Sequence, residues 1–294
     1  MTRRHLMIFG CWLTAAILCA RPMQANPGAG IVVDAHGQIF FTDTGAGIWK
    51  IDTGGKLTLV SKHIYKWIAI DKNGKFAAMR NNNWHRIDTA GDGPALLGSN
   101  DRPIAVSGDG NLYHAACHYS GPLLIVREVP SRDSFVLADV PADGYTTRMC
   151  PVDGVAVGRD GSVYFTELQT VNKVESKGAH TVMARIMELP DCTPVAGVVE
   201  GWRPYLRGLD VAADGSVYVA ASGCGQLLKV LPDGKVTAVL KSAAPWSPTA
   251  VAVAGNDLYV LEYAQGKTDK QSLPRVRKIS ADGSVSDVAT VKRN

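Results

Sequence analysis

Charged residues recur at one position of a repeated stretch of sequence. The stretch is clearest over residues 155–167, where an apolar run, an Asp-Gly pair and a second run end at Glu167. The residue six places beyond the turn in each copy is Asp43, Arg80, Ala116, Glu167, Ala221 and Glu262 in turn. Three acids and one arginine around one opening would bind a cation or a polar ligand. Polar strand ends, with Arg80 neutralising an acid, would explain the same residues.

Aromatic and arginine residues gather in the segments between the copies. Such residues are enriched in recognition surfaces, although a tryptophan there would also pack between neighbouring repeats. The candidate ligand-binding residues of these segments are Trp67, Arg148, Trp202, Arg207, Trp246 and Tyr263, with Arg102, Arg203 and Tyr205 beside them. Together with Asp43 and Arg80 they form the predicted binding set.

A histidine adds a possible catalytic group. His118 follows Cys117 at the end of a predicted strand, where it would act as a general base, bind a metal or have a structural role. No Gly-x-Ser-x-Gly motif, His-Glu-x-x-His motif or phosphate-binding glycine loop occurs in the sequence. The predicted catalytic residues are therefore Glu167, Glu262 and His118.

These residues depend on six copies of one supersecondary unit. The turn residues are Gly37, Gly74, Gly110, Gly161, Gly215 and Asn256, with spacings of 37, 36, 51, 54 and 41 residues. Short strands at such a period predict an all-β, six-bladed β-propeller with four antiparallel strands, A to D, in each blade. Residues 26–294 form this single domain. The second copy is predicted to form a hairpin over residues 68–79.

The order of strands sorts the connections into two faces. The short A–B and C–D turns share one face, and the longer B–C and D–A connections share the other. Long variable loops on a rigid scaffold usually carry the function, so the second face is the predicted binding face. Each blade is predicted to be one continuous piece of chain, and packing between the first and last blades closes the ring.

Residues 1–25 read as a secretory signal. Arg3 and Arg4 precede an apolar run over residues 7–20, and general export and twin-arginine export both fit this pattern. The mature chain then holds 28 basic and 27 acidic residues, which is not the charge balance of a nucleic-acid-binding protein. We expect a periplasmic or secreted monomer that no longer associates with a membrane once the signal is cleaved.

Four cysteines follow the signal. An even number in an exported chain favours disulfides. Cys150 and Cys192 flank the fourth blade on D–A connections, so they are the predicted bridge; Cys117 and Cys224 are the other two.

The repeats resemble NHL repeats, and the chain resembles the six-bladed superfamily of SMP-30/gluconolactonase and streptogramin lyase proteins. Residues 155–158 and 164–167 are similar to streptogramin lyase repeats, and Asp153-Gly154 to the gluconolactonase pattern. That resemblance implies a divalent cation such as calcium, held at the starts of the A strands. Of the matching positions Gly30, Trp67, Arg102, Asp153, Arg207 and Thr249, Asp153 alone has a ligand side chain. The lyases use a histidine near the last blades, but the last histidine here is His180.

The sequence favours a scaffold that binds a small molecule or another protein through the B–C/D–A face. The alternative is a lactonase or lyase that uses Glu167, Glu262, Asp153 and His118. Glu167→Gln and Glu262→Gln are expected to change binding or turnover and to leave the fold intact.

Overall fold

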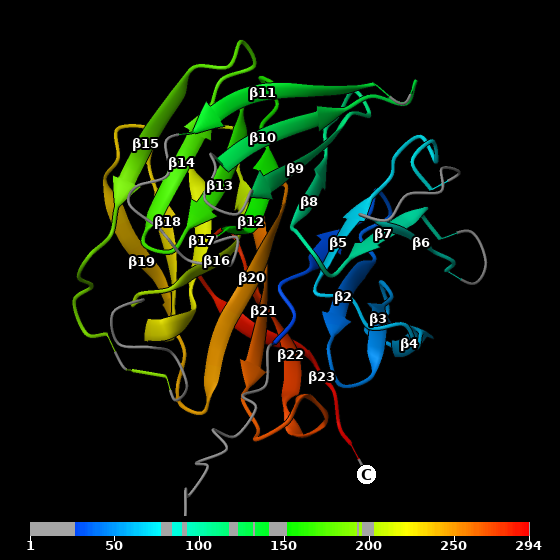
Figure 1. The fold of residues 1–294 in the computed structure, drawn as a ribbon. Helices are drawn as coiled ribbons and strands as arrows, with labels where there is room; N and C mark the ends of the chain where they lie inside the picture. Colours follow the sequence, from blue (N-terminus) through cyan, green and yellow to red (C-terminus); the bar gives the residue numbers. More distant parts are fainter. Residues whose placement is uncertain are drawn as a thin grey trace, which may run out of the picture.

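The computed structural model of the chain describes residues 27–77, 84–89, 93–117, 123–131, 133–140, 152–192, 194–195 and 203–293. Six antiparallel sheets stand around a common axis (Figure 1). The six-bladed β-propeller predicted from the repeats is confirmed. Apart from two short 3-10 turns, η2 (Ser222–Cys224) and η3 (Asp269–Gln271), the regular structure in these ranges consists of strands.

Five blades are four-stranded meanders, as the alternating sequence pattern predicts. Blade one contains β1 (Ile31–Val33), β2 (Ile39–Asp43), β3 (Gly47–Ile51) and β4 (Leu57–Ser61). Blade three contains β8 (Ile104–Val106), β9 (Leu112–Cys117), β10 (Leu123–Glu128) and β11 (Ser134–Val140). Blade four contains β12 (Val152–Val157), β13 (Val163–Glu167), β14 (Thr170–Val174) and β15 (His180–Arg185). Blade five contains β16 (Leu206–Val211), β17 (Val217–Ala221), β18 (Gln226–Val230) and β19 (Val236–Lys241). Blade six contains β20 (Trp246–Ala254), β21 (Asp257–Ala264), β22 (Leu273–Ile279) and β23 (Val285–Thr290).

Blade two differs from the prediction. Its described strands are β5 (Trp67–Ile70), β6 (His85–Ile87) and β7 (Leu96–Ser99), in the spatial order β5-β7-β6. The outer edge of β5 therefore pairs with β7, and the predicted hairpin over residues 68–79 is wrong. The Asp71 carboxylate accepts the backbone N–H of Ala77 at 2.8 Å, and Phe76 is buried against Trp84. With these contacts, residues 75–77 form turns and not the second strand of a hairpin.

The tight A–B turns use the glycines that the repeat predicts. Gly37, Gly74, Gly110, Gly161 and Gly215 all have positive φ angles between 64° and 83°. Glycine adopts this conformation without the steric cost that a Cβ atom imposes. In the last copy Gly255, with φ of 63°, has this conformation, and the predicted turn residue Asn256 follows it in a two-residue turn between Ala254 and Asp257.

The hydrophobic core is divided into six clusters among the described residues. Each cluster lies between two neighbouring blades, and one joins blade six to blade one. The innermost strands approach closely: a Cβ atom on Gly154 would lie 2.6 Å from the carbonyl oxygen of Arg207, and one on Gly208 would lie 2.6 Å from the Cβ of Ala250. Glycine is therefore required where the inner strands of blades four, five and six meet.

The ring closes without a shared strand, as predicted. The Tyr263 hydroxyl of blade six donates to the carbonyl oxygen of Thr42 in blade one at 2.7 Å. After β23, the Arg293 guanidinium donates to the Asp43 carboxylate and to backbone carbonyls, including that of Asp269 at 2.9 Å. Hydrophobic packing and this arginine together hold the first and last blades in contact.

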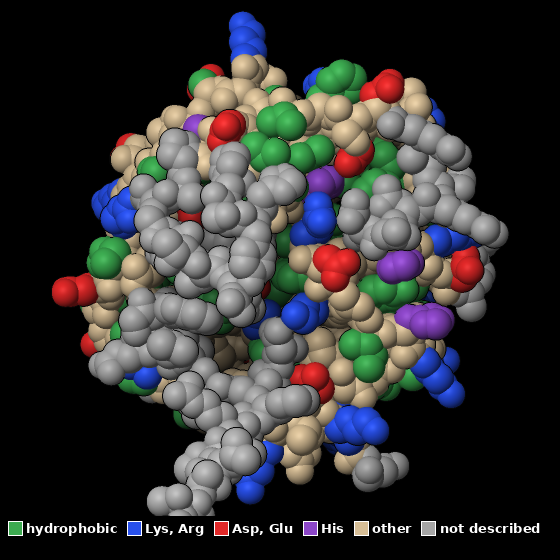
Figure 2. Space-filling model, viewed as in Figure 1, with side chains coloured by type: hydrophobic (Ala, Val, Ile, Leu, Met, Phe, Trp, Pro, Cys, Tyr) green, Lys and Arg blue, Asp and Glu red, His purple; other side chains and the backbone are tan. Residues whose placement is uncertain are grey.

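The visible surface carries mixed charges. On the described part of the face in Figure 2, basic and acidic side chains lie interspersed and neither sign forms a large patch. In the described ranges, the structure contains no helix with the length and hydrophobicity of a membrane span.

Candidate functional site: the central channel

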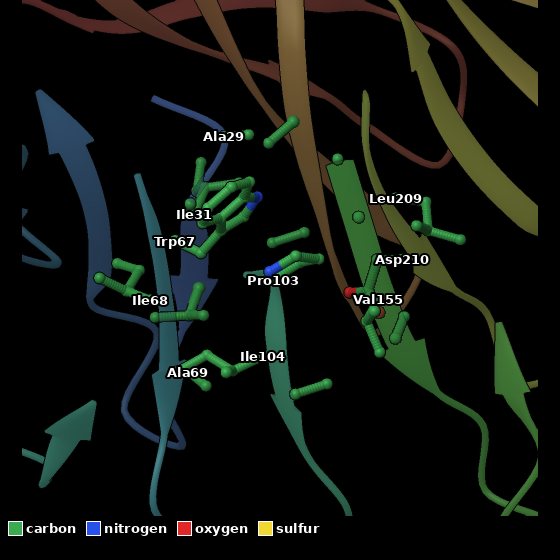
Figure 3. A pocket seen from close by; sticks show the side chains of 18 of the residues that line it. Ala29, Ile31, Trp67, Ile68, Ala69, Pro103, Ile104, Val155, Leu209 and Asp210 are labelled. Carbon is green, nitrogen blue, oxygen red and sulfur yellow. The ribbon is translucent and has the colours of Figure 1, made fainter. Parts of the chain in front are cut away.

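The innermost strands β1, β5, β8, β12, β16 and β20 enclose a cavity of about 260 Å³ on the propeller axis (Figure 3). Its walls are mostly small or aliphatic side chains. The inner edges of these strands have no further strand to pair with, so their backbone polar groups also face the cavity. The result is a narrow channel that presents hydrophobic side chains together with backbone donors and acceptors.

Burial changes along the channel. Each inner strand contains three successive residues that correspond to residues 31–33 of β1, here called the A segment. The side chains of the first and third residues of an A segment point to the same side of the strand. The first residues, which are Ile31, Ile68, Ile104, Val155, Leu209 and Val251, are all buried. The third residues, which are Val33, Ile70, Val106, Val157, Val211 and Val253, are all partly exposed. Exposure therefore increases toward the A–B turns, as expected of a channel that opens on that face.

Trp67 narrows the channel at the opposite end. Its indole Nε1 donates to the carbonyl oxygen of Asp153 at 2.8 Å, which links β5 of blade two to β12 of blade four. Blade three lies between these two blades, so the indole lies across the channel. Trp67 is 8% exposed, and the Lys66 ammonium lies 5.7 Å from the ring centre.

Arg207 and Tyr205 lie at the same end. Arg207 is 2% exposed, its Nη2 donates to the carbonyl oxygen of Pro27 at 2.7 Å, and its guanidinium lies 5.9 Å from the Tyr205 ring. Burial, with the nearby Asp153 carboxylate, raises the pKa of Tyr205 and keeps its hydroxyl protonated. The segment before β1 therefore covers this end, where the sequence predicted an open mouth.

Two of the predicted acids at the ends of the B strands, Glu262 and Asp43, form hydrogen bonds and ion pairs with other side chains of the protein. The Glu262 carboxylate is fully buried; it accepts from Arg275 Nε at 2.5 Å and from the Ser242 hydroxyl. Arg275 also lies over the Trp246 ring, 4.2 Å from its centre. The Asp43 carboxylate, also fully buried, accepts from Trp49 Nε1 at 3.0 Å and pairs with Arg293.

Neither acid is among the described residues that line the cavity. Glu167 is 7% exposed and likewise does not line it, and Tyr263 is buried between blades six and one. The pairing of Asp43 and Glu262 with other side chains of the protein accounts for polar residues at the ends of these B strands. A role of the three acids in binding or catalysis stays a prediction.

Other predicted residues fall outside the described ranges: Arg80, His118, Arg148, Cys150 and Trp202. The predicted bridge between Cys150 and Cys192 is wrong, because Cys192 is disulfide-bonded to Cys224 with a Cα–Cα distance of 4.6 Å. The side chain of Gln226 donates to the carbonyl oxygen of Pro190 at 3.0 Å, which holds the connection after blade four against blade five. Cys117 is also disulfide-bonded.

The A-strand starts do not fit the predicted divalent cation. Within the described ranges, no three His, Cys, Asp or Glu side chains come together as metal binding requires. The buried guanidinium of Arg207 would repel a cation, and the Asp153 carbonyl already accepts a hydrogen bond from Trp67. One carboxylate beside an arginine is a poor site for calcium, which takes six to eight oxygen ligands.

Sequence reasoning missed two titratable groups, the buried His114 and the cavity-lining Asp210. His114 is 3% exposed and joins Glu128, at 3.0 Å, to Arg102, at 3.4 Å. Burial lowers the pKa of His114, Glu128 opposes this effect, and the charge of Arg102 adds to it. Asp210 lines the cavity itself. Its signal in the sequence is an acid inside a strand whose counterparts in the other blades are alanine or valine.

Comparison with solved structures supports the fold. No protein-family model and no curated protein matches the chain. The structure is similar to a virginiamycin B lyase from Staphylococcus aureus, with a TM-score of 0.51 and 16% identity over 89% of this chain and 83% of that one. It is also similar to a gluconolactonase from Xanthomonas campestris, with a TM-score of 0.54 and 13% identity over 82% of this chain and 85% of that one.

A third similar structure is a calcium-binding protein, regucalcin, from Agrobacterium tumefaciens, with a TM-score of 0.50 and 14% identity over 82% of this chain and 83% of that one. The chain thus has the six-bladed propeller fold of lyases and gluconolactonases. At these identities the likeness shows the fold alone, since one propeller scaffold carries unrelated activities.

Proposed function

We propose that this chain is a binding protein that takes a small molecule into its central channel from the face of the A–B turns. The observation that carries the proposal is the change in burial along the six inner strands, from buried first residues to partly exposed third residues. A cavity of about 260 Å³ is slightly smaller than sites for drug-sized ligands, so the ligand is a small one.

Two contacts support entry from this face. Trp67 lies across the channel at the other end, and Arg207 there is covered by the segment that contains Pro27. A ligand that approached the B–C/D–A face would have to displace both. The proposal thus keeps the binding role expected from the sequence and assigns it to the opposite face.

The experiment blocks the proposed entrance. Val106 is partly exposed and lines the cavity, so Val106→Trp should fill the mouth. Saturation-transfer NMR with 1-butanol and cyclohexanol as probes should show binding to the wild-type protein and loss of binding to this variant. Val285→Trp, at an exposed position on β23, is the matched control and should bind like the wild type. Equal binding to all three proteins would exclude the channel.

The lactonase alternative has a direct test. Hydrolysis of δ-gluconolactone, dependent on an added divalent cation and abolished by Asp153→Asn, would show that the chain is an enzyme of that kind. We expect no cation-dependent turnover, because Arg207 and Trp67 stand at two of the positions where the resemblance places a cation site.

We also propose that residues 1–25 direct export and that the mature protein acts as a monomer. The disulfide between Cys192 and Cys224 supports export, because disulfides persist in oxidising compartments. Fusion of residues 1–25 to a phosphatase that is active only outside the cytoplasm should give activity. Arg3→Lys with Arg4→Lys would abolish that activity only if export uses the twin-arginine route.

A further inference from the structure

Asp210 interrupts an otherwise uniform ring of side chains. It is the second residue of the repeated A segment in blade five. The corresponding residues in blades one, two, three, four and six are Val32, Ala69, Ala105, Ala156 and Ala252. Figure 3 shows Asp210 across the cavity from Ile68, among aliphatic side chains. The other blades pack with an apolar residue at this position.

Two backbone groups hold the carboxylate in place. Oδ1 accepts from the N–H of Val211 at 2.8 Å, and Oδ2 accepts from the N–H of Val253 in blade six at 2.7 Å. Each carboxylate oxygen can accept more than one hydrogen bond, so both retain capacity toward the cavity. Burial raises the pKa of Asp210 to about 6, and the two N–H groups only partly oppose this effect. The ionised form is therefore incompletely compensated within the protein.

Few other charges face this group. Of the described residues that line the cavity on β1, β5, β8, β12, β16 and β20 and beside these strands, Lys72 is the one other charged residue. Lys72 is exposed in the turn after β5, and its charge is not among the causes of the pKa shift of Asp210. The channel therefore combines one negative group with hydrophobic walls. At its far end lie the Trp67 indole and the buried Arg207 guanidinium.

We propose that the channel binds small organic ammonium ions, with the ammonium group on the Asp210 carboxylate and the alkyl part against the aliphatic walls. The inference rests on the proposed function, since it names the ligand class of the same channel. An ammonium N–H makes a charge-assisted hydrogen bond with a carboxylate. Calcium is a weaker candidate, because it needs several oxygen ligands and the side chains here offer one carboxylate.

The experiment compares butylammonium with 1-butanol, which has the same alkyl chain and no charge. At about pH 7.5 the carboxylate is ionised, and wild-type protein should bind butylammonium at least about tenfold more tightly than Asp210→Asn does. The affinity for 1-butanol should stay within about twofold, since that probe uses the walls alone. Asp214→Asn, in the adjacent A–B turn and outside the cavity, is the matched control and should behave like the wild type.

A second measurement needs no variant. At about pH 5, below the pKa of about 6, Asp210 is protonated, so wild-type protein should lose most of its preference for butylammonium over 1-butanol. Lys72→Ala should strengthen butylammonium binding at about pH 7.5, because it removes a positive charge from the rim of the channel.

The outcomes separate the ligand class from the channel. Equal butylammonium affinity in wild type and Asp210→Asn, or no loss at about pH 5, would overturn the ammonium proposal while 1-butanol binding still supported the channel. Competition by potassium at concentrations similar to butylammonium would show an inorganic cation site and also overturn it. Failure of both probes to bind would remove the channel as the ligand site, and the ammonium proposal with it.

Discussion

Arg293 and Asp43 form the ion pair that joins the end of blade six to strand β2 of blade one. The Asp43 carboxylate is fully buried, and Arg293 also donates to three backbone carbonyls of the connection between β21 and β22. Arg293→Ala removes a partner from a buried acid, so we expect the free energy of unfolding to fall by about 2–4 kcal/mol. Urea denaturation measures this. Arg86→Ala, in an exposed pair with Asp88, should change it by less than about 0.5 kcal/mol. Similar losses in the two variants would contradict the closing role of Arg293.

The disulfide between Cys192 and Cys224 spans 32 residues. Loop-closure entropy predicts that it stabilises the folded protein by about 3–4 kcal/mol. A variant with Cys192→Ser and Cys224→Ser should therefore melt at a lower temperature than the oxidised wild type. Mass spectrometry of the wild type should show the peptide that links these two cysteines. A linked peptide of Cys150 and Cys192 would instead restore the bridge predicted from sequence.

Gly154 tests the close contact between blades four and five. Its added Cβ atom would meet the Arg207 carbonyl and the Leu209 side chain at 2.6 Å each. Gly154→Ala should destabilise the protein by about 1–3 kcal/mol. Gly108→Ala is the control, because an added Cβ atom there meets nothing within 4 Å. That variant should be neutral or stabilising by up to about 1 kcal/mol. Chemical denaturation of both variants decides between strain at the contact and a general effect of replacing glycine.

Asp210 should make stability depend on pH. Its pKa is raised from 3.8 to about 6, so between these values the folded state binds more protons than the unfolded state. Its contribution to stability therefore falls as the pH rises, by on the order of 2–3 kcal/mol over the whole interval. Asp210→Asn removes this dependence. The difference in unfolding free energy, wild type minus variant, should fall between about pH 4 and pH 7. A constant difference would contradict the raised pKa.

We expect the buried ion pair between Glu262 and Arg275 to stabilise the folded protein. Glu262→Gln removes the ion pair between Glu262 and Arg275. The Arg275 side chain is 13% exposed, and it would keep only its longer contact, at 4.0 Å, with the exposed carboxylate of Asp287. We expect a loss of about 2 kcal/mol and a change in tryptophan fluorescence, because Arg275 lies over Trp246. Glu175→Gln, at an exposed position, is the control. An unchanged melting temperature in Glu262→Gln would favour the role in binding or turnover that was predicted from sequence.

The repeated turns made the propeller predictable, because a glycine with positive φ followed by an alternating strand depends on local sequence alone. Blade two departed from its pattern because the Asp71 side chain bonds the backbone of Ala77, and the hydrophobic pattern does not register such a contact. The partner of Glu262 was hidden for a similar reason. Arg275 lies directly opposite Glu262 in the ladder of β21 and β22, and that register emerges only when the strands pair.

Only part of the channel could be predicted from the sequence. The sequence identified the inner strands and placed Trp67 and Arg207 at their starts, but not which end of the channel these side chains obstruct. That outcome depends on the direction of the Trp67 indole and on the path of the chain at Pro27. Asp210, by contrast, stands out once the six copies are aligned, because an acid occupies a place held elsewhere by valine or alanine.

The absence of a shared strand at the seam has a consequence for how the protein folds. Five of the blades pair strands that follow one another in the chain, so these hairpins form with little loss of loop entropy. The contacts between Tyr263 and Thr42 and between Arg293 and Asp43 join residues 221 and 250 positions apart. Their formation requires the ends of the longest loop in the molecule to meet. The seam should therefore be the last interface to assemble, and in the native protein it should open more readily to hydrogen exchange than the five interfaces between consecutive blades.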